Sequence, residues 1–365
     1  MDLLQFRSVC MPWRAAGTPD PKLGPRVIDH RFHPRHWILV PLPEEAAPAG
    51  ATRRQLLNVT TRKLVQVHLP PKLAVVEGPS GAPEGMLVLR DDRTLVVRLL
   101  NPVTGHVVDL PSLRTLQRGR RRGPIPRAFK ADYEVTAAGF AGGYSTVVVY
   151  LGYVNRMAMA KPGDKRWTLV NNLFGLHAGP VPDYPSLSSA TFQGRFYCFD
   201  SNGISVVDVA RRRLQLLAAI PISWFIKFIG SASMVDHGGD LMLVWPSSRI
   251  TPVFGHDGQL KSRAKVTRIE LFHVDLENGR LLPVRDLGED AVFVGSLGAV
   301  LLPNARHCRS SSVHANTVYF KFNMRERDFG AFQLSTNHEA NDLPRVEECT
   351  FARHIASYVT STRRV

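Results

Sequence analysis

The feature that most constrains the fold is a succession of short apolar, β-branched segments with no long helix between them. Thirteen segments have the length of a strand and are bounded by Gly, Pro, Asn or Asp. They are RQLLNV, LVQVHL, GMLVLR, TLVVRLL, HVVDL, STVVVYL, RFYCF, ISVVDV, LMLVW, RIELFHVDL, AVFVG, TVYFKF and GAFQL. Parallel sheets need crossover helices between their strands, so this pattern favours an all-β fold over an α/β fold.

A polar turn between paired strands recurs along the chain and indicates repeated units. It occurs as NVTTRK (58–63), NPVTGH (101–106), KPGDKRW (161–167), DVARRR (208–213), DLENGR (275–280) and LSTNHE (334–339). Successive turns begin 43, 60, 47, 67 and 59 residues apart. Four-stranded propeller blades repeat about every 40–50 residues, so we predict a Kelch-like β-propeller of six or seven blades. Two β-sandwich domains are the alternative, since such turns occur in any antiparallel protein.

The one amphipathic helix that the sequence predicts lies at the beginning of the chain. Its apolar stripe consists of Leu3, Leu4, Phe6, Val9 and Trp13. Pro12 removes a backbone donor and ends this helix at about residue 11. Residues 17–31 mix proline and glycine with alternating charges, which is typical of a linker. We therefore divide the chain into an N-terminal helical segment (1–16), a linker (17–31) and a propeller (32–365).

The charge of the chain is strongly positive. Lys and Arg number 46 against 31 Asp and Glu, a formal net charge of +15, and 36 of these cations are Arg. Such a charge favours acidic partners. The densest run, 114–127, has no apolar periodicity and predicts an exposed loop between blades. Its arginines are Arg114, Arg118, Arg120, Arg121, Arg122 and Arg127. A nuclear-import signal, a phosphate-contacting patch and a solvated loop are three interpretations of this run.

Motifs for catalysis, cofactors and metals do not occur in the sequence. It contains no GxSxG, HExxH, GxxxxGK[ST] or GxGxxG motif, so we expect neither an enzyme nor a cofactor. The four cysteines show no CxxC spacing, which argues against a zinc site and fits a reducing, intracellular compartment. His30, His33 and His36 lie three residues apart, but Pro34 interrupts them, so we favour polar residues that precede a strand over a metal site.

The longest uncharged run, residues 135–155, could be mistaken for a membrane helix. It is 21 residues long but contains four glycines, so we predict two short strands around a glycine turn. We expect a protein of the nucleus or the cytoplasm that does not enter a membrane.

Two parts of the sequence resemble a known family. DLLQFRSVCMPWRAA (2–16) resembles the C-terminal half of an F-box, which has the form LxxFRxVCxxWRxxA. The rest of the chain resembles plant, chiefly grass, F-box proteins whose C-terminal region is a KIB-type β-propeller. The matching segments, in the order of the family, include RFHPRHWI (31–38), EGMLVLRDDRTLVVRLLNPVTGHVVDLP (84–111), FQGRFYCFDSNGISVVDV (192–209) and LFHVDLENGRLLPVRDLGEDAVFVG (271–295).

The resemblance implies a substrate-recognition subunit of an SCF-type (Skp1–cullin–F-box) ubiquitin ligase. In that family the F-box helices bind a Skp1-like adaptor, and the propeller presents loops to a target protein. The apolar stripe would face the adaptor or pack on the propeller. The LPxDLLxxIxxRL-like stretch that opens an F-box does not occur in this chain, so the resemblance implies a truncated F-box and doubtful Skp1 binding. A stand-alone propeller that binds proteins, or nucleic acid through its arginine loop, is the alternative.

Overall fold

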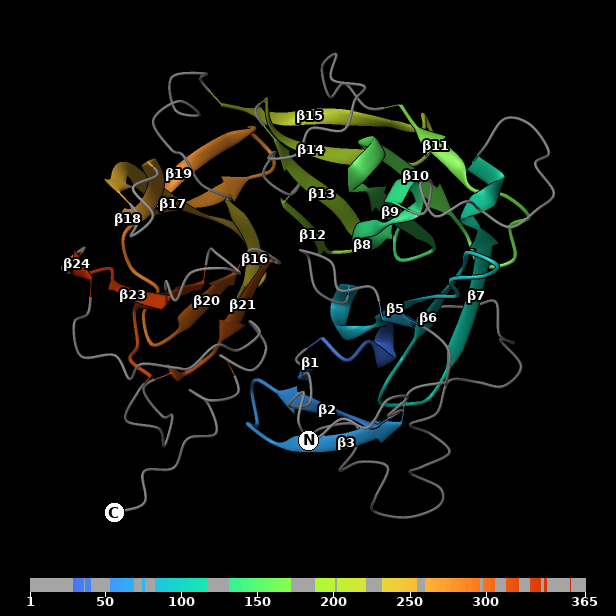
Figure 1. Cartoon of the computed structure of the whole chain (residues 1–365), viewed down its shortest axis with the longest axis horizontal. Helices are drawn as coiled ribbons and strands as arrows, with labels where there is room; N and C mark the ends of the chain where they lie inside the picture. Colours follow the sequence, from blue (N-terminus) through green and yellow to red (C-terminus); the bar gives the residue numbers. More distant parts are fainter. Residues whose placement is uncertain are drawn as a thin grey trace. The chain divides into compact units, whose positions relative to one another are not determined.

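The structure is a computed structural model that describes most of the strand-forming part of the chain (Figure 1). The described residues are 29–35, 37–40, 53–68, 74–75, 83–116, 131–171, 188–200, 202–220, 232–254, 260–295, 298–305, 313–321, 329–335, 338–339 and 355. Several predictions lie outside them: the N-terminal helix with Leu3, Leu4, Phe6, Val9 and Trp13, most of the linker, and Arg118, Arg120, Arg121, Arg122 and Arg127 of the basic run.

The described residues form an all-β structure of six sheets, as predicted. The sheets follow one another along the chain, and each of the six repeated turns joins the last two strands of one sheet. This is the organisation of a six-bladed β-propeller, the lower of the two predicted blade numbers. The alternative of two β-sandwich domains is wrong, because a pair of sandwiches would contain four sheets with strands exchanged between them.

The chain divides into two compact units, which we describe separately. The first unit comprises Met1–Tyr184, Ser189–Tyr197 and Val206–Gln215. The second unit comprises Pro185–Ser188, Cys198–Ser205 and Leu216–Val365.

Three complete sheets belong to the first unit. The first sheet consists of β1 (Trp37–Val40), β2 (Arg53–Asn58) and β3 (Leu64–His68) in that order. The second consists of β4 (Ala74–Val75), β5 (Leu87–Arg90), β6 (Val96–Leu100) and β7 (Val107–Ser112). The third consists of β8 (Val135–Ala141), β9 (Thr146–Leu151), β10 (Arg156–Ala160) and β11 (Thr168–Val170). Short 3-10 helices are η2 (His30–Phe32), η4 (Pro83–Gly85), η5 (Leu113–Leu116), η7 (Ala131–Tyr133) and η8 (Gly152–Val154).

Three further sheets complete the described strands. The fourth, which contributes residues to both units, consists of β12 (Ser188–Phe192), β13 (Arg195–Asp200), β14 (Gly203–Asp208) and β15 (Arg213–Ala219). The fifth consists of β16 (Ser233–His237), β17 (Asp240–Phe254), β18 (Leu260–Asp275) and β19 (Arg280–Val284). The sixth has the order β21 (Gly298–Leu302), β20 (Ala291–Gly295), β22 (Thr317–Lys321), β23 (Phe329–Gln333) and β24 (His338–Glu339).

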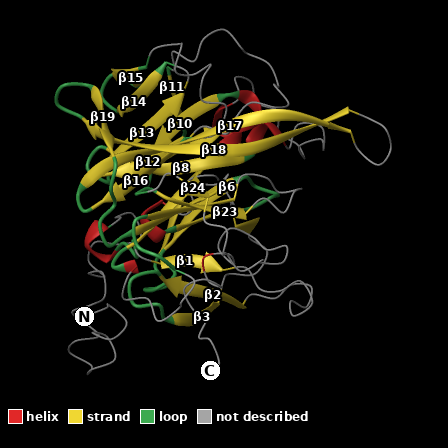
Figure 2. Cartoon of the chain, turned by 90° about the vertical axis from the view of Figure 1, so that its left-hand side faces the viewer, coloured by secondary structure: helices red, strands yellow, loops and turns green. Residues whose placement is uncertain are grey.

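Two sheets differ from the predicted four strands. The first sheet has three described strands, and the sixth has five because β20 pairs with β22 in parallel and with β21 in antiparallel register. The fifth sheet contains unusually long strands: β17 and β18 continue past their pairing with β16 and β19 as a two-stranded ribbon (Figure 2). The sequence predicted only the apolar parts of these strands, because the ribbon lacks a continuous apolar run.

Two of the repeated turns share one local structure. In both of them an asparagine side chain at the end of a strand accepts hydrogen bonds from the backbone N–H groups two and three residues later. Asn58 Oδ1 accepts from Thr60 and Thr61 at 3.0 and 2.8 Å, and Asn101 Oδ1 accepts from the N–H groups of residues 103 and 104 at 3.0 and 3.1 Å. The N–H of Gly105, at φ +75°, then donates to the carbonyl oxygen of Asn101. Short polar side chains favour this geometry, which is why the turns are recognisable in the sequence.

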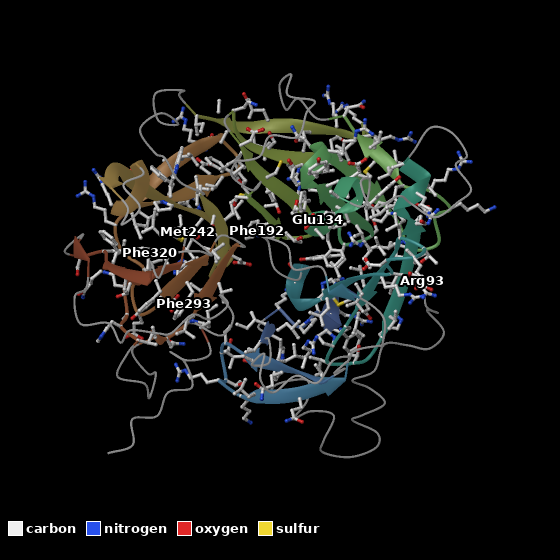
Figure 3. The ribbon with its side chains drawn as sticks, viewed as in Figure 1. Arg93, Glu134, Phe192, Met242, Phe293 and Phe320 are labelled. Atoms are coloured by element: carbon white, nitrogen blue, oxygen red, sulfur yellow. The ribbon has the colours of Figure 1, made fainter. Side chains whose placement is uncertain are left out.

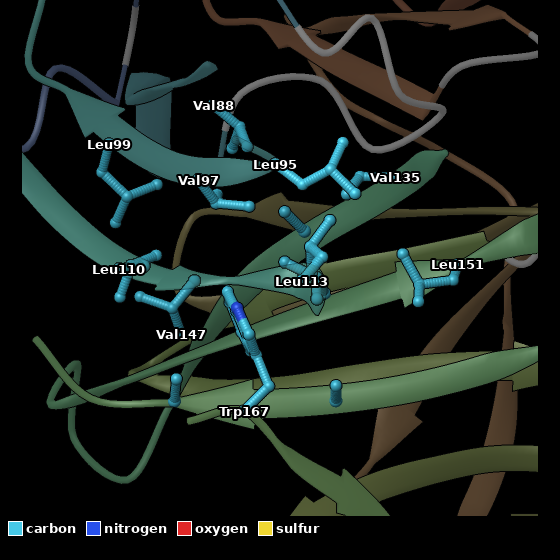
Figure 4. Close-up of a cluster of buried hydrophobic side chains, with 14 of the residues drawn as sticks. Val88, Leu95, Val97, Leu99, Leu110, Leu113, Val135, Val147, Leu151 and Trp167 are labelled. Carbon is cyan, nitrogen blue, oxygen red and sulfur yellow. The ribbon is translucent and has the colours of Figure 1, made fainter. Parts of the chain in front are cut away.

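Apolar side chains pack one sheet against the next in the first unit (Figure 4). The cluster between the second and third sheets includes Val97, Leu99, Leu110, Leu113, Val135, Val147, Leu151 and Trp167. Leu39 of the first sheet packs against Leu87 and Leu89 of the second. Two sheets stacked in this way bury the faces that meet each other.

A separate apolar cluster holds the last two sheets of the second unit together. It joins Met242 and Val244 of β17 to Val292 and Val294 of β20 and Phe320 of β22. Figure 3 labels Met242 and Phe320 in this cluster. Both sheets therefore belong to one core within this unit.

The long uncharged run forms two strands, as predicted. β8 and β9 occupy most of residues 135–155, and Gly142 and Gly143 lie between them with φ values of +58° and +65°. No helix among the residues that the structure describes is long and apolar enough to cross a membrane.

Replacing Asn101 tests the importance of the repeated turn. The Asn101 side chain is buried, accepts two turn hydrogen bonds and donates from Nδ2 to the carbonyl oxygen of Phe32 at 2.7 Å. We expect Asn101→Ala to lower the free energy of unfolding in urea by about 2 kcal/mol, because two partly buried backbone donors lose their acceptor. Asn101→Asp keeps the acceptor and should still form the turn. An unchanged unfolding midpoint for Asn101→Ala would contradict this role.

The aspartates of the turns make stability depend on pH. Backbone hydrogen bonds from Arg211 and Asn278 hold the pKa values of Asp208 and Asp275 below their ordinary value. Because the folded pKa is the lower one, each carboxylate stabilises the fold above about pH 4, and this contribution is lost as the pH falls through the folded pKa. We expect the double variant Asp208→Asn with Asp275→Asn to lose less stability than the wild type between pH 5 and pH 3, by urea unfolding at each pH. Glu277→Gln, a neighbour that accepts no turn bond, should keep the wild-type slope; equal slopes in all three proteins would refute the assignment.

Candidate functional site

The segment just before the first strand is fixed to the first unit by a cluster of charged and aromatic side chains. This lead-in segment comprises residues 29–35 and contains η2, which Asp29 caps by accepting a hydrogen bond from the backbone N–H of Arg31 at 3.2 Å. The side-chain hydrogen bond from Arg31 holds the pKa of Asp29 below its ordinary value. At the other end, the N–H of Trp37 donates to the carbonyl oxygen of Pro34 at 2.9 Å, which leads the chain into β1.

The lead-in segment contacts Glu84, Phe140 and Tyr144. The ring of His33 stacks on Phe140 with centroids 4.8 Å apart, and the ring of His30 stacks on Tyr144 at 5.0 Å. The guanidinium of Arg35 bonds to the carboxylate of Glu84 and donates from Nη2 to the Tyr144 hydroxyl at 3.1 Å. Residues 49 and 109 positions apart in the sequence are thereby held in one place.

His33 is the buried centre of this cluster. Its side chain is 1% exposed, and neither ring nitrogen has a hydrogen-bond partner among the residues that the structure describes; Nδ1 lies 3.8 Å from Glu84 Oε2. The Glu84 carboxylate thus lies between His33 and Arg35, and its side chain is 9% exposed. A paired carboxylate in an enclosed position holds its two neighbours in a fixed orientation.

The structure describes two of the three histidines that the sequence singled out. His30 stacks on Tyr144, His33 stacks on Phe140 and also meets the edge of Tyr144, and His36 lies outside the described residues. No group of three potential metal ligands comes together among the residues that the structure describes. The interpretation as residues that precede a strand agrees with β1 beginning at Trp37. The sequence did not predict the burial of His33, because its partners Glu84 and Phe140 follow more than 50 residues later.

Two residues that lie against the lead-in segment have a left-handed backbone conformation. Glu84 adopts φ +54° and Gly85 φ +78°, and a Cβ atom on Gly85 would overlap the carbonyl oxygen of Pro34. Only glycine allows the lead-in segment to approach this closely.

The described part of the predicted basic loop is not a loop. Arg114 lies half-buried in η5, Leu113 beside it is fully buried, and the Leu113 N–H donates to the carbonyl oxygen of Leu95 at 2.9 Å. The prediction was wrong here because Leu113 fills the core next to Trp167, a contact that local composition does not reveal. The hairpin position of the Arg211–Arg213 run is confirmed, since β14 ends at Asp208 and β15 begins at Arg213.

The described cysteine shows no reactive character. Cys198 is fully buried in β13, and burial raises the pKa of its thiol far above the ordinary value. A thiol in this state is a poor nucleophile.

Comparison with known proteins identifies relatives over most of the chain. A family model for the KIB1-4 β-propeller matches residues 54–340. The F-box protein SKIP23 of Arabidopsis thaliana is 24% identical over 394 residues, covering 91% of this chain and 84% of the relative. The F-box/kelch-repeat protein At3g18720 of the same plant is 24% identical over 240 residues, covering 65% of this chain and 57% of the relative.

Solved structures show weaker likeness. A chain of a nidogen/laminin complex is 11% identical with a TM-score of 0.35, covering 84% of this chain and 92% of that one. Virginiamycin B lyase from Staphylococcus aureus is 10% identical with the same TM-score, covering 82% and 79%.

Substitution of Gly85 tests the docking of the lead-in segment. We expect Gly85→Ala to cost about 3 kcal/mol, from the left-handed backbone and from the overlap with Pro34, and to speed hydrogen exchange in residues 29–35. Gly105→Ala is a matched control, because Gly105 has a similar φ of +75° but nothing lies within 4 Å of an added Cβ. The control should cost about 1 kcal/mol and leave exchange in the lead-in segment unchanged. Equal effects of the two substitutions would argue against close docking.

Proposed function

The chain belongs to the KIB1-4 β-propeller family, and from this membership we propose that it is the target-recognition subunit of an SCF-type ubiquitin ligase. The observation that carries the proposal is the likeness to SKIP23, a protein named as an F-box protein, over 91% of this chain. The residues 2–16, which resemble the end of an F-box, precede the propeller as an adaptor-binding segment would.

The lead-in segment supports a division in which the N-terminal segment binds the adaptor and the propeller binds the target. Residues 29–35 connect the N-terminal segment to the first blade, and the contacts of His33 and Arg35 with Glu84 and Tyr144 hold them against the first unit. A rigid connection fixes the direction in which the chain leaves the propeller. A ligase benefits from this, because the target must be held at a constant distance from the site of ubiquitin transfer.

In this proposal no residue of the chain acts chemically. Specificity comes from loops and turns that the sheets hold in place, which is how rigid scaffolds present binding residues. The Skp1-like adaptor and a target protein are the partners, and the ligase would act in the nucleus or the cytoplasm. A stand-alone propeller that binds a partner without Skp1 is the other outcome that an experiment can reveal.

Association with Skp1 tests the proposal directly. We would express the tagged chain, and a version extended at its N-terminus to a complete F-box, together with Skp1 and cullin. We expect the extended version to recover both subunits and the 365-residue chain to recover less, because half of a three-helix module cannot bury its own core.

Substitutions in the stripe supply the specificity control. Leu4→Glu with Phe6→Glu in the extended version should reduce Skp1 recovery at least about tenfold, since both apolar side chains would be lost from the helix face. Gln5→Glu, between them in sequence, should leave recovery unchanged. Failure of the extended version to recover Skp1 would refute a ligase role and favour a stand-alone propeller.

A further inference from the structure

Hydrogen bonds join three separate segments of the first unit into one basic surface, formed by Arg93, Arg114, Lys165 and Arg166. Arg114 Nη2 donates to the carbonyl oxygen of Arg93 at 2.9 Å, which holds η5 against the turn between β5 and β6. The backbone N–H of Trp167 donates to Thr115 Oγ1 at 3.0 Å, and Trp167 Nε1 donates to the carbonyl oxygen of Pro111 at 2.6 Å. These two bonds hold the turn between β10 and β11 against the same η5 helix. The three segments that carry these cations are therefore bonded to one another.

Three of these cations have no carboxylate partner. Arg93, Lys165 and Arg166 are exposed, and none of them forms an ion pair with a residue that the structure describes. Figure 3 labels Arg93 on the turn that follows β5. Unpaired charges brought together in this way raise the local positive potential.

The nearest aspartates are bound within their own turns. Asp91 Oδ1 accepts from the backbone N–H groups of Arg93 and Thr94 at 2.8 and 2.9 Å, and Asp92 Oδ1 accepts from Arg90 Nη2 at 2.9 Å. Asp164 Oδ2 accepts from the backbone N–H of Lys161 at 2.8 Å. Asp92 is thus paired with Arg90, and none of the three aspartates forms an ion pair with Arg93, Lys165 or Arg166 in the described part of the chain.

The sequence on the C-terminal side of Arg114 adds only positive charge. Residues 110–131 contain six arginines and one lysine and no acidic residue. Seven of the 46 cations of the chain therefore fall in this stretch of the sequence with no acidic residue between them.

The chemistry of the surface favours a protein over a nucleic acid. Single-stranded nucleic acids bind where aromatic side chains are exposed for stacking. Among residues 91–94, 112–116 and 161–167 the only aromatic is Trp167, which is 4% exposed and uses its indole N–H within the fold. Exposed guanidinium and ammonium groups without a stacking surface suit the carboxylates of an acidic peptide.

We propose that the surface of Arg93, Arg114, Lys165 and Arg166 binds an acidic segment of a protein partner. The inference rests on the proposed function in one respect: the partner is then a target of the ligase. The contacts are exposed ion pairs, so the affinity comes from several weak interactions and falls with salt.

The experiment measures binding of a fluorescein-labelled glutamate-rich peptide to the full chain by anisotropy, with a glutamine-rich peptide of equal length as the control. We expect binding of the glutamate peptide only, weakening as NaCl rises from about 50 to about 200 mM. The triple variant Arg93→Glu, Lys165→Glu, Arg166→Glu should bind at least about tenfold more weakly. Lys63→Glu, Arg156→Glu, Arg280→Glu, which changes the charge equally at exposed cations elsewhere, should lose clearly less affinity.

Three results would overturn the proposal. One is equal binding of the glutamate and glutamine peptides; another is equal loss of affinity in the two triple variants. The third is tighter binding of single-stranded or duplex DNA than of the glutamate peptide at equal salt, which would assign the surface to nucleic acid. Melting curves of both variants would show that they are folded. The assay contains no ligase subunit, so its failure is distinct from a failure to associate with Skp1.

Discussion

Burial of both faces of each inner sheet is the constraint on which the structure depends. The sheet of β8–β11 packs through Val147 and Val149 into the cluster that it shares with the preceding sheet. On the following side, the N–H of Phe140 donates to Thr191 Oγ1 at 2.8 Å, and Phe196 lies where a side chain on Gly139 would have to be. A strand enclosed on both sides needs apolar residues at successive positions, so Val147, Val148 and Val149 are all fully buried. This requirement explains why the sequence contains continuous apolar runs.

Such tight packing leaves recognition to the turns and to the segments that cross the sheet ends. Four of the repeated turns are closed by the side chain of their first residue, which accepts backbone hydrogen bonds within the turn: Asn58, Asn101, Asp208 and Asp275. The hydrogen bond between Trp167 and Thr115 connects the turn between β10 and β11 to η5. In the same way, the bond between Arg35 and Glu84 connects the lead-in segment to η4. The same interactions that complete the fold therefore also position the exposed cations and the N-terminal part of the chain.

The family likeness and the geometry support two separate proposals, one about the complex and one about the partner. Likeness to F-box proteins concerns the kind of complex that the chain joins. The proposed basic surface concerns the chemistry of the partner, and it rests on the contacts of Arg114 with Arg93 and of Trp167 with Thr115. The two statements can therefore fail or succeed independently.

The sequence by itself determined the all-β class and the six repeated turns, and it predicted six or seven blades, of which the structure has six. It could do so because strand alternation, turn residues and their spacing depend on neighbours within a few positions. Only the tertiary structure decided that His33 meets Glu84 and Phe140, that Arg114 belongs to a packed helix, and that β17 and β18 extend as a ribbon. The first two features depend on side chains about 50 or more positions apart, and no local pattern encodes which distant side chain will lie beside a given residue. The ribbon depends on the pairing of β17 with β18 along their whole length, which the sequence does not reveal because the ribbon lacks a continuous apolar run.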